Sequence, residues 1–216
     1  MRMTHLTHRR LWVYAAVCGL LLFIPTGIAQ AVYVYPFQIF TNDGGYYNSP
    51  DLDMYMEVSN GAGRVDFTFY NISSIQSSLA RIYYDDGSLL DISAIENSPG
   101  TSFSEVYPGP GNLPSGETIG FYADREFSIG AVAPPPENGV NPPPPDEWVK
   151  VSFTLKNGGT LEGVVDELND GTLRVGIHII ALPDGSSESA IAVIPEPTTL
   201  ALLGLGIPAL LRKRRS

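Results

Sequence analysis

Cysteine is almost absent from this sequence. The only one, Cys18, lies in an apolar N-terminal stretch, and residues 32–194 contain none. That segment therefore cannot form disulfides, use a thiolate nucleophile or bind a metal through cysteine. A segment without disulfides has to be stabilised by its core, by ions or by partners.

Basic residues and histidine are also scarce between residues 32 and 194. Six basic residues stand against 22 acidic ones, a net charge of −16. This charge repels phosphate and excludes nucleic acid as a partner, and we interpret it mainly as a solvated acidic surface. The single histidine, His178, lacks a second histidine or a cysteine for a conventional zinc site. No catalytic-triad motif accompanies it, so we expect a packed, hydrogen-bonded histidine.

The N-terminus has the layout of a secretory signal peptide. Basic residues near the start precede an uncharged apolar run, Leu11–Ile24, and Ala29 and Ala31 occupy the small-residue positions of an A-x-A cleavage site. We predict a signal peptide over residues 1–31, with a signal helix and cleavage after Ala31. The alternative is an uncleaved N-terminal anchor.

The segment between the two ends has the pattern of an all-β domain. Apolar and polar residues alternate in Arg64–Ile72, Glu147–Gly159 and Gly171–Ile180, as they do in half-buried strands. Clusters of Gly, Pro, Asn and Asp separate these runs, which is typical of antiparallel sandwiches and barrels. We predict a mainly β fold, a single antiparallel β-sandwich of the jelly-roll kind over residues 32–194.

Local patterns add two hairpins, one helix and one long loop to this prediction. Ala80–Ile92 and Thr118–Val132 each have two β-prone runs around a turn. Apolar residues at i, i+3, i+4 and i+7, after a capping threonine, predict a short helix near residues 160–169, with a bent strand as the alternative. The proline-rich residues 133–147 predict an exposed loop, or else a proline ligand for a partner's aromatic groove.

Aromatic residues are dense at the start of the mature segment. Val32–Phe40 alternates tyrosine and phenylalanine with other residues, which predicts a strand whose aromatic face is buried. The alternative interpretation is that exposed tyrosines there and shortly after, including Tyr46, Tyr47 and Tyr55, form a stacking platform for polysaccharide.

Acidic clusters are the remaining candidates for chemistry. Paired carboxylates cleave sugars when they face each other across the substrate, which spacing in a sequence does not establish. The candidate acids are Asp51, Asp53, Asp85, Asp86, Glu126, Asp146, Glu147, Asp166 and Glu167. Asp166–Gly171 departs from an EF-hand loop at the third and twelfth positions, so calcium is left only to turn acids such as Asn42-Asp43 or Asp85-Asp86. We predict no catalytic, cofactor-binding or metal-binding residue.

The C-terminus combines three elements: a Pro-Glu-Pro triplet, an apolar run and a basic end. Their residues are Pro195, Glu196, Pro197, a predicted transmembrane helix over 198–211, and Arg212, Lys213, Arg214 and Arg215. The apolar run is short for a permanent span, and the basic end is expected to stay cytoplasmic. This order closely resembles the PEP-CTERM sorting signal of exported bacterial proteins.

The resemblance implies a destination more than an activity. It implies recognition by an exosortase, cleavage near the triplet, and export across the inner membrane of a Gram-negative-type bacterium. Anchoring in that membrane is then transient and precedes delivery to the cell surface or the extracellular matrix. Residues 147–189 also resemble a module that recurs among PEP-CTERM proteins, through elements such as Trp148-Val149 and Gly176-Ile177-His178. That module implies no catalytic residue.

Three functional hypotheses follow. The leading one is an exported, exosortase-processed structural or interaction protein of the surface or exopolysaccharide matrix, without enzymatic activity. The second is a carbohydrate-binding module, with or without calcium, whose partner is extracellular polysaccharide. The third is a small polysaccharide-modifying enzyme, which requires two facing acids in a groove.

Overall fold

A computed structural model describes residues 31–61, 63–85, 90–106, 111–124, 128–142 and 147–194. The predicted signal helix with Ala29, the sorting residues Pro195 to Arg215 and the transmembrane helix over 198–211 lie outside these ranges. Within them, no helix is both long and apolar enough to span a membrane.

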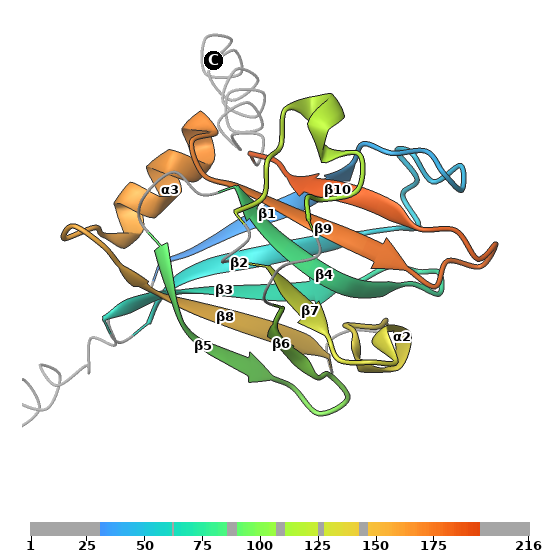
Figure 1. Cartoon of the computed structure of the whole chain (residues 1–216), viewed down its shortest axis with the longest axis horizontal. Helices are drawn as coiled ribbons and strands as arrows, with labels where there is room; N and C mark the ends of the chain where they lie inside the picture. Colours follow the sequence, from blue (N-terminus) through green and yellow to red (C-terminus); the bar gives the residue numbers. More distant parts are fainter. Residues whose placement is uncertain are drawn as a thin grey trace, which may run out of the picture. The chain divides into compact units, whose positions relative to one another are not determined.

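The described chain forms one antiparallel sheet of ten strands in the order β5-β8-β3-β2-β1-β10-β9-β4-β7-β6 (Figure 1). The strands are β1 (Val32–Ile39), β2 (Met54–Gly61), β3 (Arg64–Asn71), β4 (Ser78–Asp85), β5 (Leu90–Asn97), β6 (Phe103–Glu105), β7 (Ile129–Ala131), β8 (Trp148–Leu155), β9 (Arg174–Ile180) and β10 (Glu188–Ala192). The helices are the 3-10 helix η1 (Gly116–Ile119), α2 (Pro135–Asn138) and α3 (Leu161–Asp170).

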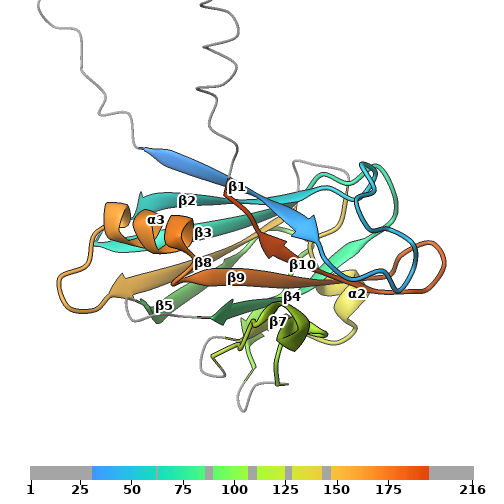
Figure 2. The same ribbon diagram turned by 90° about the horizontal axis from the view of Figure 1, so that it is seen from above.

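Strand β1 joins the two halves of this sheet. Its first part, Val32–Pro36, pairs with β2, and its second part, Phe37–Ile39, pairs with β10. The change of partner falls at Pro36, which has no N–H to donate to a ladder. The predicted mainly β, antiparallel fold is confirmed. The two-sheet sandwich is not confirmed, because the sheet is continuous through β1 and rolls into a nearly barrel-shaped body (Figure 2).

The core fills the inside of the rolled sheet. Phe67 of β3, Tyr84 of β4 and Phe153 of β8 meet edge to face, with ring centroids 4.9–5.6 Å apart. All three are fully buried, although they come from both halves of the sheet. Such aromatic pairs contribute about 0.5–1.5 kcal/mol each beyond the area they bury, so this contact holds the halves together.

The predicted helix is present as α3, and its cap is the expected one. The side chain of Thr160 accepts a hydrogen bond from the N–H of Gly163, and Gly171 ends the helix at φ +81°. The four apolar residues of the pattern are buried in the same core cluster as the sheet. The three strands predicted from alternation are also confirmed, as β3, β8 and β9.

Both predicted hairpins are wrong. β4 pairs with β9 and β7, whereas β5 pairs with β8 in the other half of the sheet. The chain therefore passes from one half of the sheet to the other between β4 and β5, where a tight turn was expected. The two strands line opposite walls of the core. In the second stretch, the end of η1 and an irregular segment occupy the place of the first strand, and β7 is the only strand among the described residues of this stretch.

The segment that replaces this strand forms a second layer. Leu113 and Phe121 pack with Tyr83 of β4 on the outer face of β4 and β9, and all three are buried. Gly176 of β9 makes room for them, since a Cβ there would lie 2.6 Å from Leu113 Cδ2 and 3.2 Å from Phe121 Cζ. Strand alternation alone predicts an outer face for Gly176 but not what covers it.

Substitution of Gly176 by valine tests this close packing. We expect Gly176→Val to lower the free energy of unfolding by about 1–3 kcal/mol, because the added side chain overpacks the interface with Leu113 and Phe121. Urea unfolding of residues 32–194 measures it. The cost should shrink in a Leu113→Ala background, which removes the nearest atoms; an equal cost in both backgrounds contradicts the packing.

Candidate functional site

The acidic candidates do not converge on one site within the described residues. Asp51 accepts a hydrogen bond from Ser74 Oγ at 2.9 Å, and Asp85 forms an ion pair with Arg174. Glu147 accepts hydrogen bonds from Asn141 and so holds a neighbouring loop. No group of three or more His, Asp or Glu side chains in the described part of the chain is placed to hold a metal ion.

The other predicted acids are scattered. Asp166 and Glu167 lie on α3, which makes Asp166–Asp170 helical rather than a calcium loop. Burial raises the pKa of Asp53, whose backbone N–H donates to Ser73 Oγ. Asp86, Glu126 and Asp146 lie outside the described residues.

Arg174 makes several polar contacts on the outer face. It donates to the backbone oxygens of Ile119 (3.2 Å) and Gly120, and pairs with Asp85. Its guanidinium carbon also lies 5.3 Å from the ring centroid of Phe121. These contacts hold the second layer against β9.

Glu188 also holds a loop in place, at the other end of the same half of the sheet. It is 1% exposed, and its carboxylate accepts hydrogen bonds from Thr41 Oγ1 (2.5 Å) and the N–H of Gly44 (2.9 Å). The N–H of Ser189 returns a bond to Thr41 Oγ1 at 2.8 Å. A buried carboxylate needs such donors. Sequence reasoning missed this role, because nothing local to Glu188 indicates a partner more than a hundred residues away.

His178 lies on the outer face of β9, as alternation predicts, with Ile177 and Ile179 in the core. Burial, and secondarily the positive charge of Arg81 opposite it, lowers its pKa to about 4. The expected packing is confirmed, but the expected hydrogen bond is absent at Nε2, which is buried without a partner. The side chain is therefore a neutral imidazole at pH 7.

The aromatic side chains of β1 point inward. Tyr35 is 3% exposed, and Tyr33 and Phe37 pack partly buried against the core, so the buried-face interpretation of this strand is confirmed. The hydroxyl group of Tyr35 donates a hydrogen bond to Asn169 Oδ1 at 3.3 Å, and burial raises the pKa of this tyrosine to about 12. These rings are unavailable as a platform.

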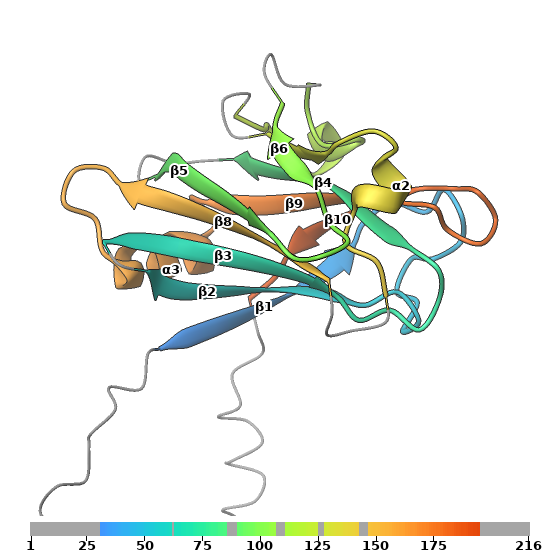
Figure 3. The same cartoon turned by 90° about the horizontal axis from the view of Figure 1, so that it is seen from below.

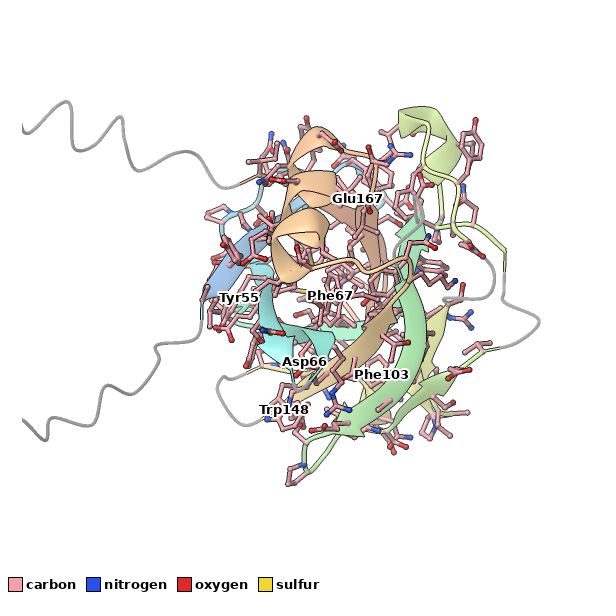
Figure 4. All side chains as sticks on the ribbon, turned by 90° about the vertical axis from the view of Figure 1, so that its left-hand side faces the viewer. Tyr55, Asp66, Phe67, Phe103, Trp148 and Glu167 are labelled. Atoms are coloured by element: carbon pink, nitrogen blue, oxygen red, sulfur yellow. The ribbon has the colours of Figure 1, made fainter. Side chains whose placement is uncertain are left out.

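A different set of aromatic side chains lies on the outer face of the first half. Tyr55 of β2, Tyr70 of β3 and Trp148 of β8 are directly opposite one another across neighbouring strands, and we call them the aromatic row. All three are half-buried. The rings of Tyr55 and Tyr70 stack at 4.8 Å, and Lys150 Nζ lies 5.4 Å from the Trp148 ring centroid. Figure 4 shows Tyr55 and Trp148 on the same side of the sheet.

The surroundings of the aromatic row are polar. The next row of the same face contains Glu57 and Lys150, and Lys150 forms an ion pair with Glu96 at 3.2 Å. Burial and the nearby Glu57 carboxylate raise the pKa of Tyr70 to about 12. Sequence reasoning named Tyr55 but missed its two companions, because only the strand register brings them together.

The low pKa of His178 predicts a pH dependence of stability. The unfolded chain, with an ordinary histidine pKa near 6.5, binds more protons than the folded chain between pH 6.5 and about 4. Protonation of His178 therefore does not reduce the free energy of unfolding above pH 6.5. As the pH drops from 6.5 toward 4, the free energy of unfolding falls by up to about 3 kcal/mol. In urea unfolding at pH 7.5 and pH 5, His178→Gln should lose less stability than the wild type. An equal loss in both proteins contradicts the assignment.

Comparison with known families identifies the end of the chain. Residues 193–215 match the family described as the PEP-CTERM protein-sorting motif. No curated protein and no solved structure matches the chain. The matched residues include the Pro-Glu-Pro triplet and the basic end, as predicted. The match supports a PEP-CTERM exported protein, in which a membrane-anchored C-terminal signal follows the β-fold and is processed by an exosortase.

Proposed function

We propose that the β-fold of residues 32–194 is the cargo of this sorting signal, a structural or interaction protein of the cell surface or exopolysaccharide matrix without enzymatic activity. The observation that carries the proposal is where the motif starts. It begins at Val193, directly after the last strand, so that cleavage near the triplet releases the whole sheet. The signal peptide predicted at the other end supplies the export step.

The polar contacts of the fold favour a structural role over catalysis. A glycosidase needs two carboxyl groups about 5–9 Å apart across a groove. Among the described acids, Asp85 is paired with Arg174, Glu147 holds Asn141, and Glu188 is buried against Thr41 and Gly44. Each of these groups stabilises a loop, and each sits on a different part of the sheet.

Removal of the sorting signal tests the proposal in the host. We expect the full chain to be processed and recovered at the surface or in the matrix, and a chain lacking Pro195–Ser216 to be exported but to remain unsorted. Glu196→Ala, which keeps the apolar run and the basic end, separates cleavage from membrane retention. All three proteins are fractionated and their masses are measured. If the three proteins distribute among the fractions and migrate identically, the proposal is wrong.

A second candidate function, carbohydrate binding, is favoured by the aromatic row. Half-exposed aromatic rings beside hydrogen-bonding side chains offer sugars both stacking and polar contacts. The net charge of −16 on residues 32–194 disfavours acidic polysaccharides, so the ligand that fits is a neutral one. The four strands from β1 to β8 spread this face over about 14 Å, which is enough for more than one sugar ring.

Truncation of Trp148 tests this second candidate. In a pull-down with neutral host polysaccharide, Trp148→Ala should weaken binding by at least about tenfold, the usual cost of losing an aromatic residue that contributes strongly to binding. Tyr122→Ala is the control, since Tyr122 is 67% exposed and lies outside the aromatic row. Binding is measured with and without calcium, and unfolding midpoints show that both variants fold. Equal binding by both variants, or none by the wild type, rules the candidate out.

A further inference from the structure

The sorting motif begins while the chain is still hydrogen-bonded to the sheet. The N–H of Val193, the first residue of the motif, donates to the backbone oxygen of Pro36 at 2.9 Å. Only Ile194 separates this bond from the triplet, so Pro195 starts within about 7 Å of the sheet. From Ile194 the predicted transmembrane helix begins four residues on, a distance of at most about 14 Å. The tether between the fold and its membrane anchor is therefore short.

The strand beside this exit has an apolar and uncharged outer side. Val32 and Val34 are 51% and 45% exposed. Pro36, the next residue on the same side of β1, is also exposed, and Ile194 after β10 is 54% exposed. We call these four residues the β1 edge. The alternate residues of β1 point into the core instead; they are Tyr33, Tyr35, Phe37 and Ile39.

The β1 edge contrasts with the charge of the domain. Neither β1 nor the stretch from Ser189 to Ile194 contains a charged residue, whereas residues 32–194 have a net charge of −16. An acidic surface is repelled by anionic lipid headgroups. Of the β2 residues opposite Val32, Val34 and Pro36, only Glu57, opposite Val34, is charged. The β1 edge is therefore less acidic than the domain as a whole, which suits it to lie against a membrane. Figure 3 shows β1 beside β2 at the lower side of the body.

We propose that the β1 edge rests on the lipid surface while the chain is still anchored, before the exosortase cuts, and that this contact orients the triplet for cleavage. The partner is the lipid headgroup region, and the inference rests on the sorting role proposed above. Two valines, a proline and an isoleucine form a weak contact by themselves. A short tether makes the contact intramolecular and so raises the effective concentration of the β1 edge at the membrane surface. Cleavage therefore separates the domain from its anchor and also releases the β1 edge from the membrane.

A pair of cysteine variants tests the contact, because the chain has no cysteine after Cys18. Val34→Cys reports on the β1 edge. Val132→Cys is the matched control, since Val132 is also 45% exposed and follows β7, which lies on the other side of the sheet from β1 (Figure 2). The uncleaved chain with its sorting signal is labelled with a fluorescent dye and reconstituted in vesicles that contain brominated lipids.

We expect the brominated lipids to quench the dye at position 34 several-fold more than the dye at position 132. The same Val34→Cys protein ending at Ile194 should show no such quenching. Equal quenching at the two positions in the anchored chain overturns the proposal, as does quenching at position 34 that persists without the sorting signal. No exosortase is present, so failure here is distinct from failure of the sorting experiment.

Cleavage in the host provides a second, independent readout. The double variant Val32→Ser, Val34→Ser should be cleaved several-fold more slowly than the wild type, and Val132→Ser at the wild-type rate. A flexible glycine–serine spacer between Ile194 and Pro195 should abolish that difference, because it uncouples the fold from the triplet. Unfolding midpoints confirm that the variants fold. Unchanged cleavage of the double variant contradicts the orienting role.

Discussion

The structure depends on the way in which β1 divides its hydrogen bonds between two partners. Up to Pro36 the strand belongs to the ladder with β2, and from Phe37 it belongs to the ladder with β10. One strand therefore links two sets of strands into a single sheet. The link also brings the first and last strands of the fold side by side, which places the chain's exit next to its entry.

Rolling of the sheet gives its two faces different surroundings. Its inner face is lined by aromatic and aliphatic side chains from both halves, which pack together as protein interiors do. The sites proposed above lie on the outer surfaces. One half carries the aromatic row, while the other is covered by the second layer that Arg174 and Gly176 hold in place. The outer face of one half thus leaves the aromatic row partly exposed, whereas the outer face of the other half is covered by the second layer.

Sequence reasoning predicted the features that local physics controls. Alternation identified β3, β8 and β9, and the helical spacing with Thr160 identified α3. The order of prolines and charges identified the sorting signal. Each of these signals lies within a short window of the chain.

Pairing between distant strands was beyond the same reasoning. The runs now seen as β4 and β5 suggest a hairpin locally, yet their partners are β9 and β8, whose apolar faces lie on opposite walls of the core. The anchoring role of Glu188 and the alignment of Tyr70 with Trp148 likewise depend on register. Such contacts join residues that are far apart in the sequence, so local patterns do not contain them.

The central claim is that the folded domain is cargo released from a C-terminal sorting signal. The intact mass of the native protein, isolated from its host, tests this claim most directly. The account predicts a chain that begins at Val32 and ends near the Pro-Glu-Pro triplet, with any covalently attached group visible as added mass. A native protein that still includes the basic C-terminal residues through Ser216 would contradict it.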